Sequence, residues 1–301
     1  MRTKISRFTW PLVLATSLVT GTIARSAIYQ DAEKLAAGTA YGASSFFDCV
    51  GVIDINTSAG PNGGSFVMIA PQWGLTAAHV MEPYSGATVT SATASFGATL
   101  INPLLTVSID SWQVYPGYTY DTPVAHGVDL ALVHFSSPVT DITPAQLYGG
   151  SLESVFVSVF AGYGKPGTAG NGIGIWDHVR RAGQNTIGDA YWPYADSQYM
   201  ISMLDEAAYG GSQPIEWMGS PGDSGGASFL LDNGQLTLVG INSFVIRQGN
   251  YDIGSGTGTL NITLPDYRDW IVSQVPEPSS AVLLGGGFLL MLGCCLLRTK
   301  E

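Results

Sequence analysis

The sequence predicts an all-β fold, either a sandwich or a barrel, made of many short strands. Short runs rich in β-branched and aromatic residues recur along the chain, and clusters of Gly, Pro, Asn and Ser separate them. Long amphipathic helix patterns are scarce. The predicted strands include residues 65–70, 87–96, 132–135, 155–161, 178–187, 199–204, 227–231 and 236–245.

Two short helices are expected at the margins of this β region. The first spans residues 30–37, and the second spans residues 265–272 with Pro265 at its start, where proline is favoured. No fixed-period repeat lies between them. An all-β unit of about 200–250 residues is an ordinary size.

The composition narrows the classes of function. The chain has 301 residues, of which 46% are hydrophobic and 12% charged, and its formal net charge is −11. This apolar content argues against a disordered chain and is ample for a core. The acidic balance argues against nucleic-acid binding, because no basic surplus exists to neutralise phosphates. Three cysteines, two of them adjacent, cannot form a disulfide framework.

The first 26 residues have the pattern of a secretory signal peptide. They carry four basic residues and no acid, then an apolar stretch over residues 8–20 and the small residues Ala24 and Ser26. This pattern predicts export and cleavage after Ser26. The alternative is an N-terminal membrane anchor, for which the apolar stretch is short.

The last residues, 274–301, resemble the bacterial PEP-CTERM sorting signal. Pro276-Glu277-Pro278 precedes an apolar run of 17 residues, 281–297, and a basic end. The resemblance implies a Gram-negative source, an exosortase-type processing partner, and transient anchoring in the inner membrane before release to the surface or outside. The alternative is a plain C-terminal anchor. Cys294 and Cys295 lie in the apolar run, so Cys49 is expected to be a buried, unpaired thiol.

Between these ends the chain is more acidic than the whole-chain figure suggests. Residues 27–273 contain 6 basic and 21 acidic residues, a net charge of −15. Three segments in this part have the residues of a nucleophilic site: 74–80 with His79, 127–133 with Asp129, and 219–226 with Ser224.

Each of the three residues has a chemical reason to take part. Ser224 lies in a glycine-rich turn, where backbone N–H groups can hold a developing oxyanion. A serine is a weak nucleophile unless a base lies within hydrogen-bond reach, and His79 is the candidate. A buried carboxylate fixes the orientation of such a histidine, and the apolar run after Asp129 predicts its burial.

In these motifs and their order, His then Asp then Ser, separated by 50 and 95 residues, the chain resembles the trypsin-like serine peptidases. The matching motifs are Thr76-Ala77-Ala78-His79, Asp129-Leu130-Ala131-Leu132 and Gly222–Gly226; Ser243-Phe244-Val245 and Asp269-Trp270-Ile271 are similar to two later motifs. The resemblance spans residues 45 to 273. It implies two six-stranded antiparallel β-barrels and a short C-terminal helix, with the backbone N–H groups of Gly222 and Ser224 as the oxyanion hole.

The resulting division of the chain has five parts. A signal peptide (1–26) precedes an N-terminal segment or short pro-region (27–44), an N-terminal barrel (45–149), a C-terminal barrel with its closing helix (150–273), and the sorting tail (274–301).

The resemblance also assigns substrate contacts. Met218 occupies the position that sets the base of the specificity pocket, and Ser243, Phe244 and Val245 form the segment that binds the substrate backbone. Met218 cannot pair with Lys or Arg, and Val245, in place of the usual glycine, narrows the entrance. We therefore expect a preference for small or apolar P1 residues.

The resemblance leaves open how Asp223, which precedes the nucleophile, is neutralised. In animal enzymes a freed N-terminus does this, but Ile28 would reach that role only after trimming beyond Ser26. We expect an internal arginine instead, with Arg181 preferred over Arg180. The alternative is that both arginines are solvated.

The sequence thus predicts a secreted serine endopeptidase acting on protein or peptide substrates through an acyl-enzyme. It is expected to be a monomer that needs no metal or cofactor, binds no nucleic acid, and meets a membrane only through the sorting tail. The alternative is a catalytically silent, surface-displayed binding or matrix protein on a peptidase scaffold.

Overall fold

The computed structural model describes residues 27–82, 87–119, 128–153, 155–169, 171–194, 197–204, 213–232, 234–246 and 258–275. The predicted signal peptide and all but the first two residues of the predicted sorting tail lie outside these ranges. No helix among the described residues is long and apolar enough to cross a membrane.

The first half of the chain forms a closed six-stranded barrel. Its strands follow the order β2-β3-β4-β7-β6-β5, and neighbouring strands are antiparallel. The strands are β2 (Val50–Thr57), β3 (Gly60–Ala70), β4 (Trp73–Thr76), β5 (Val89–Phe96), β6 (Leu105–Val114) and β7 (Ala131–Phe135).

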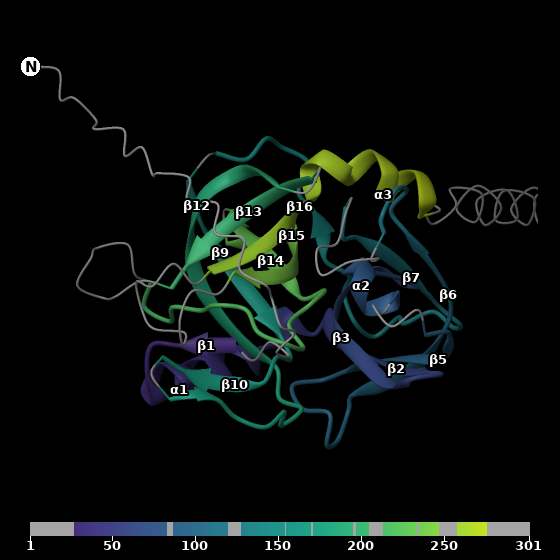
Figure 1. Ribbon diagram of the computed structural model, residues 1–301, viewed down its shortest axis with the longest axis horizontal. Coiled ribbons are helices and arrows are strands. Elements are labelled where there is room, and N and C mark those ends of the chain that lie inside the picture. The colour runs from purple at the N-terminus through teal and green to yellow at the C-terminus, as the bar shows by residue number, and fades with distance from the viewer. Residues whose placement is uncertain are drawn as a thin grey trace, which may run out of the picture.

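The second half forms another six-stranded ring, β14-β9-β12-β13-β16-β15, which a pairing of β14 with β15 closes. Its strands are β9 (Phe156–Gly162), β12 (Arg181–Tyr194), β13 (Ser197–Met203), β14 (Ala227–Asp232), β15 (Gln235–Ile246) and β16 (Gly258–Thr263). The two barrels lie side by side, with α3 (Arg268–Gln274) at the top of the view (Figure 1). The prediction of two six-stranded barrels and a short C-terminal helix is confirmed.

Aromatic side chains fill the first barrel. Phe66, Phe96 and Phe135 come from three different strands and are fully buried, with ring centroids 5.0–6.0 Å apart in edge-to-face geometry. Such pairs add about 0.5–1.5 kcal/mol each beyond the area that they bury. α3 covers this barrel, since Trp270 and Tyr267 both pack their rings against Tyr115.

The N-terminal segment is packed into the fold. It contains β1 (Ala27–Tyr29), α1 (Ala32–Gly42) and a 3-10 turn, η1 (Ser45–Phe47). β1 pairs in parallel with β10 (Pro166–Thr168), which pairs with β11 (Gly172–Ile173). Asp31 is the N-cap of α1, and its side chain accepts a hydrogen bond from the Lys34 N–H. The helix packs against β12.

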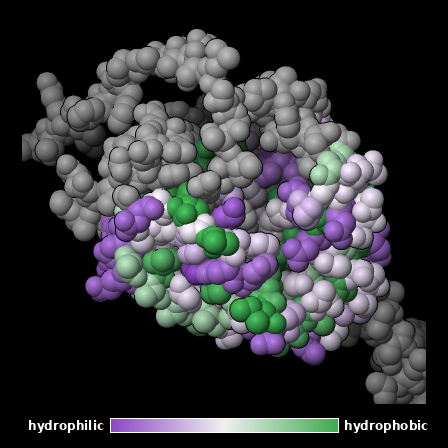
Figure 2. Space-filling model, turned by 60° about the horizontal axis from the view of Figure 1, so that its bottom comes forward, coloured by the Kyte–Doolittle hydropathy of each residue, from purple (hydrophilic) through white to green (hydrophobic). Residues whose placement is uncertain are grey.

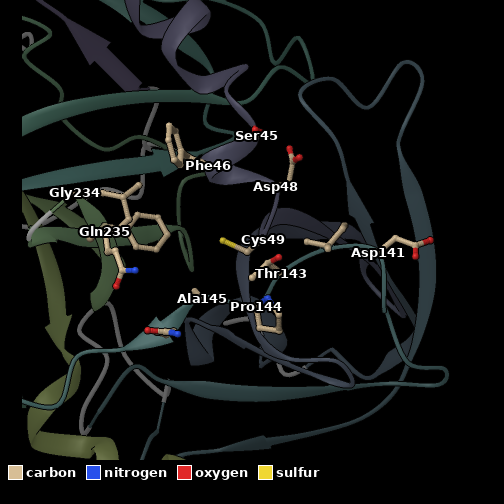
Figure 3. A pocket seen from close by; sticks show the side chains of 14 residues that line it. Ser45, Phe46, Asp48, Cys49, Asp141, Thr143, Pro144, Ala145, Gly234 and Gln235 are labelled. Atoms are coloured by element: carbon tan, nitrogen blue, oxygen red, sulfur yellow. The ribbon is translucent and has the colours of Figure 1, made fainter.

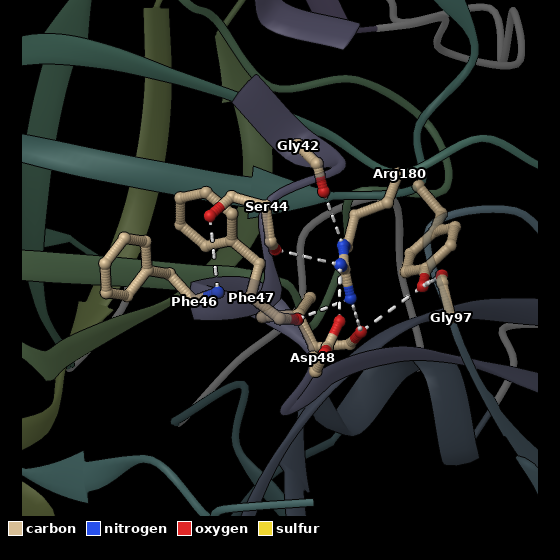
Figure 4. Close-up of polar contacts among 9 residues, drawn as sticks. Gly42, Ser44, Phe46, Phe47, Asp48, Gly97 and Arg180 are labelled. Carbon is tan, nitrogen blue, oxygen red and sulfur yellow. Dashed lines mark hydrogen bonds and ion pairs between the residues drawn. The ribbon is translucent and has the colours of Figure 1, made fainter. Parts of the chain in front are cut away.

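Arg180 fixes the end of this segment to the second barrel. Its guanidinium is fully buried and donates to the carbonyls of Gly42, Ser44 and Phe47 at 2.6–3.2 Å (Figure 4). It also pairs with Asp48 at 2.9 Å. Gly42 passes so close to the 180–181 backbone that a Cβ there would lie 2.6 Å from the carbonyl oxygen of Arg180.

The strand β8 (Gln146–Leu147) pairs in parallel with β15 of the second barrel. The chain therefore reaches the second barrel by residue 146. Cys49 is a free, buried thiol, as expected.

Candidate active site

The pairing of β4 with β7 brings His79 and Asp129 together. Thr76 at the end of β4 is the register partner of Ala131 at the start of β7. His79 follows Thr76 by three residues on the short helix α2 (Ala78–Met81), and Asp129 precedes Ala131 by two. Two residues 50 positions apart therefore meet at the same edge of the first barrel.

Asp129 holds the histidine through two contacts. Its Oδ2 lies 2.8 Å from Nδ1 of the ring, and its Oδ1 accepts the backbone N–H of His79 at 2.9 Å. Asp129 is 3% exposed, whereas the His79 side chain keeps 26% of its surface exposed. The buried carboxylate thus orients the His79 ring through Nδ1, while part of the His79 side chain remains exposed to solvent.

Electrostatics move the two pKa values in opposite directions. Burial lowers the pKa of His79, but the charge and hydrogen bond of Asp129 outweigh it, so the pKa lies above its ordinary value. Burial raises the pKa of Asp129, but His79 and Ser243 outweigh it, so the pKa lies below its ordinary value. Such a histidine accepts a proton readily, beside a carboxylate that stays ionised.

The turn that carries Ser224 packs directly on the residues that lead to His79. The N–H of Ser65 donates to the Ser224 carbonyl at 2.8 Å. Gly225 has φ +82°, and a Cβ on it would lie 2.1 Å from Oγ1 of Thr76 and 3.0 Å from the Ala77 nitrogen. Only a glycine leaves room for this contact. Gly225 therefore allows the turn of the second barrel that carries Ser224 to pack against the first barrel.

Two backbone N–H groups in this turn are available. Gly222 has φ +96°, and its carbonyl accepts the Ser65 hydroxyl at 2.6 Å. Within the part of the chain that the structure describes, the N–H groups of Gly222 and Ser224 donate to no protein acceptor, whereas those of Asp223, Gly225 and Gly226 all do. These are the two donors expected to hold an oxyanion.

Asp223 is buried beneath the same turn. Its oxygens accept hydrogen bonds from the Ser220 hydroxyl at 2.6 Å and from the Gly164 N–H at 2.8 Å. A Cβ on Gly164 would overlap both the Ser220 hydroxyl and the Asp223 carboxylate. Burial raises the pKa of Asp223 to about 6, against the lowering effect of these hydrogen bonds and of the more distant Arg181.

The expected ion pair between Asp223 and Arg181 is not formed. Arg181 instead pairs with Asp177, with Nη2–Oδ2 at 2.5 Å and Nη1–Oδ1 at 3.0 Å, and donates to Thr39. Arg180 pairs with Asp48. The reason is the position of the two arginines beside the N-terminal segment: residues 42–48 bind the guanidinium of Arg180, and Asp177 together with Thr39 binds that of Arg181.

The predicted substrate residues are Met218 and three residues of β15, Ser243, Phe244 and Val245. Met218 is fully buried, exchanges two backbone hydrogen bonds with Ile28 at 2.8 and 3.0 Å, and packs with Leu204 and Val245. Phe244 packs edge-to-face on Tyr199. β15 pairs with β14 as far as Ile241 and with β16 over residues 240–246.

Ser243 has a role that the sequence did not predict. Its hydroxyl donates to Oδ2 of Asp129 at 2.5 Å, so it supports the acid as well as lying in the substrate segment. The roles of Ser65 and Ser220 were also missed, because a single serine beside a glycine gives no signal in one sequence. Only the glycines around them, Gly64 and Gly222, mark the close approach.

A separate pocket of about 500 Å³ lies between the 45–49 segment, residues 141–146 and the β14–β15 hairpin (Figure 3). Cys49 points into it, but burial raises the pKa of this thiol to about 12, so it is not a nucleophile at neutral pH. The pocket contains none of the three predicted catalytic residues. Among the described residues, no cluster of three or more His, Cys, Asp or Glu side chains could hold a metal ion.

The two barrels and the His79–Asp129 pair beside a serine-bearing glycine turn define the class of protein, a trypsin-like serine endopeptidase. The chain belongs to the trypsin family, whose model matches residues 43–271. A solved structure described as HL collagenase at 1.7 Å resolution matches 77% of this chain and 96% of its own, with 20% identity and a TM-score of 0.58. That likeness shows the fold alone. No curated protein matches the chain.

Proposed function

We propose that this peptidase is exported and cleaves peptide bonds through an acyl-enzyme, with Ser224 as nucleophile, His79 as base and Asp129 as the group that orients His79. Oγ of Ser224 attacks the scissile carbonyl carbon while its proton passes to Nε2 of His79. The N–H groups of Gly222 and Ser224 stabilise the oxyanion. His79 then donates the proton to the leaving amine, and water hydrolyses the ester by the same route.

The observation that carries this proposal is the contact between the barrels at Gly225. It sets the serine turn against Thr76 and Ala77, which are three and two residues before His79. A fluorophosphonate probe tests it. The folded protein should be labelled, and Ser224→Ala should abolish labelling. A folded, processed protein that is not labelled favours the alternative of a silent binding protein.

The pocket chemistry supports a preference for small or apolar P1 residues. Met218 is fully buried and belongs to one hydrophobic cluster with Ile28 and Leu204, against which Val245 packs. The thioether of Met218 carries no charge, so it gives a buried Lys or Arg side chain no ionic partner. A peptide-library profile of the mature enzyme tests this, and a profile dominated by Lys, Arg or Glu would contradict it.

Export gives a route to neutralise Asp223 that differs from the expected arginine. Cleavage after Ser26 creates an amine on Ala27. Ala27 pairs with Pro166, two residues after Gly164, and its neighbour Ile28 pairs with Met218, two residues before Ser220. Gly164 and Ser220 are the groups that hold the Asp223 carboxylate. We propose that this amine, in its protonated form, is the cation that neutralises Asp223. Removal of the signal peptide would then suffice to create it.

The remaining expectations concern location. We propose that the tail from residue 274 anchors the protein in the inner membrane until an exosortase-type peptidase removes it, and that the released enzyme is a monomer. Replacing Pro276, Glu277 and Pro278 by Ala tests the sorting step. The variant should stay in the membrane fraction, and normal release would contradict the proposal.

A further inference from the structure

Ser65 is a buried hydroxyl residue at the contact between the two barrels. It lies in β3, on the side of the first barrel nearest the second (Figure 1). It is 0% exposed, so it takes no part in the mixed hydrophilic and hydrophobic surface, one face of which Figure 2 shows. Its hydroxyl is therefore removed from solvent, and hydrogen bonds within the protein must satisfy it.

Two neighbours determine where the proton of this hydroxyl points. The N–H of Tyr163, which can only donate, lies 2.9 Å from Oγ of Ser65. The carbonyl of Gly222, which can only accept, lies 2.6 Å from the same oxygen. The hydroxyl therefore accepts a hydrogen bond from Tyr163 and directs its own proton to Gly222.

The backbone of Ser65 binds the same turn a second time. Its N–H donates to the Ser224 carbonyl at 2.8 Å. Ser65 thus holds two carbonyls, those of Gly222 and Ser224, and these belong to the peptides on either side of the peptide that joins Asp223 to Ser224. That middle peptide carries the Ser224 N–H, one of the two groups proposed to stabilise the oxyanion. Both neighbours of this donor peptide are therefore held from β3.

The other hydrogen bonds of the turn are made within the second barrel. They run from the backbone N–H groups of Asp223, Gly225 and Gly226 to the carbonyls of Ser220, Asn242 and Asp223 at 2.7–2.8 Å. They leave the Gly222 carbonyl to Ser65. Because Gly222 has φ +96° and no Cβ to limit rotation, the orientation of its carbonyl depends on this bond.

An oxyanion hole lowers the barrier only when its donors already point at the position where the negative charge develops. Rotation of the peptide between Gly222 and Asp223 would turn the next peptide, and with it the Ser224 N–H. We propose that Ser65 is a positioning residue for the oxyanion hole, because its hydroxyl, oriented by Tyr163, fixes the Gly222 carbonyl and thereby the donor. This role rests on the proposed acyl-enzyme function. The first barrel then supports the oxyanion hole as well as supplying the base.

Ser65→Ala tests the role, since it removes the hydroxyl and keeps the backbone bonds of residue 65 to Ser224 and Thr76. On a peptide amide, kcat should fall by about 10- to 100-fold, less than the roughly 10²–10³-fold that loss of a whole oxyanion donor costs. KM should not change, because the oxyanion forms only after the substrate is bound. The acid limb of the pH profile should also stay in place, since the hydroxyl bonds to neither His79 nor Asp129.

Two inhibitors with the same peptide separate the oxyanion from ground-state binding. A peptidyl trifluoromethyl ketone is attacked by Oγ of Ser224: a C–O bond forms, the carbonyl π pair moves to oxygen, and the serine proton passes to His79. The matching methyl ketone reports binding without that stabilised adduct. In Ser65→Ala the Ki of the first should rise by the factor by which kcat falls, and the Ki of the second should be unchanged.

Two further variants complete the design. Ser158→Ala removes another fully buried serine hydroxyl that donates to a backbone carbonyl, that of Phe229 at 3.0 Å, and should change none of these values. Ser65→Cys keeps a weaker donor at the same position and should lie between the wild type and Ser65→Ala. It gives the same reading where the alanine variant does not fold.

An unchanged kcat in Ser65→Ala, an equal rise of both Ki values or a shifted acid limb overturns the positioning role, and so does the same loss of kcat in Ser158→Ala. A wild-type protein that cleaves no peptide and binds the trifluoromethyl ketone no better than the methyl ketone overturns the proposed function itself. An active wild type with an unaffected Ser65→Ala overturns only the role of Ser65.

Discussion

The hydroxyl of Ser243 donates a 2.5 Å hydrogen bond to Oδ2 of Asp129, the same oxygen that lies 2.8 Å from Nδ1 of His79. The carboxylate is therefore held from both barrels, since Ser243 belongs to β15 of the second and His79 to the first. The alignment of the two barrels thus bears directly on the orientation of the histidine.

Replacing Ser243 by Ala should lower kcat by about ten-fold, because a hydrogen bond to a charged group contributes about 1.5–3 kcal/mol. The lost donor leaves Asp129 more basic, so the acid limb of the kcat/KM profile should move to higher pH. The matched control is Ser158→Ala, which removes another buried serine bond, from Ser158 to the Phe229 carbonyl at 3.0 Å. An unchanged pH profile in Ser243→Ala would contradict the role assigned to this hydroxyl.

Activity should fall as the pH drops through the raised pKa of His79, because protonated His79 cannot accept the serine proton. Asp129→Asn removes the charge that raises this pKa and leaves the burial that lowers it. The histidine should then titrate below its ordinary value of about 6.5, and kcat should fall by roughly 10⁴-fold. NMR titration of the His79 ring in Ser224→Ala and in Ser224→Ala/Asp129→Asn measures both pKa values. A ring pKa that does not fall in the double variant would count against the coupling.

The linked effect on stability has a definite sign. Because the folded pKa of His79 is raised, its pairing stabilises the fold fully below the unfolded pKa, and this contribution disappears as the pH rises through the folded value. Asp129 has a lowered pKa, so its contribution is present above its unfolded pKa and is lost as the pH falls. Denaturant unfolding of Ser224→Ala from pH 5 to 9, compared with Ser224→Ala/Asp129→Asn, isolates the pair.

Loss of the Arg180 guanidinium should be costly. Arg180→Gln leaves the carbonyls of Gly42, Ser44 and Phe47 without this donor, and at about 1–3 kcal/mol for each buried group left unsatisfied it should cost at least about 3 kcal/mol. Arg181→Gln leaves one carbonyl, that of Val179, without this donor and breaks a pair whose acid is 38% exposed, so it should cost less, about 1–2 kcal/mol. Chemical denaturation of the two variants makes the comparison, and equal losses would contradict the clamp described for Arg180.

A blocked N-terminus should reduce activity if the Ala27 amine neutralises Asp223. A chain that starts at Ala27 should be active, whereas one that keeps two residues before Ala27 should lose at least ten-fold in active sites titrated with a fluorophosphonate. Arg181→Gln is the control and should retain full activity, because Arg181 pairs with Asp177. Full activity in the extended chain would exclude the amine.

The pKa of Asp223 adds a second readout to that experiment. With its pKa raised to about 6 by burial, the ionised group costs folding free energy above pH 6, at most about 3 kcal/mol, and this cost disappears as the pH falls toward 4. The extended chain should therefore gain stability between pH 7 and pH 5. In the chain that starts at Ala27, the free amine should reduce this dependence of stability on pH. Asp223→Asn should abolish the dependence both in that chain and in the extended one.

The sequence predicted the parts of the fold and site that depend on local pattern. The strands follow from β-branched runs, and the glycines at 222, 225 and 226 follow from a turn that packs without Cβ atoms. Gly225 is the clearest case, because its φ is +82° and a Cβ on it would clash with the side chain of Thr76. His79 and Asp129 meet because their motifs end and start neighbouring strands.

The parts that failed depend on contacts between distant segments. Arg181 was expected beneath Asp223. It bonds instead to Thr39, which is 142 residues earlier in the chain, and to Asp177, a local partner four residues away. Nothing in the periodicity of residues 30–42 indicates which strand that helix will cover. The bond from Ser243 to Asp129 spans 114 residues and likewise leaves no local trace.

The contacts of Arg180 with residues 42–48 also bear on the order in which the chain folds. The contacts join positions separated by 130 to 138 residues, and the guanidinium comes from the second barrel. Residues 42–48 can complete these contacts only after Arg180 has been synthesised, when more than half of the chain has followed. Contacts of such long range slow folding, and the clamp therefore delays completion of the fold until the residues of the second barrel have been delivered.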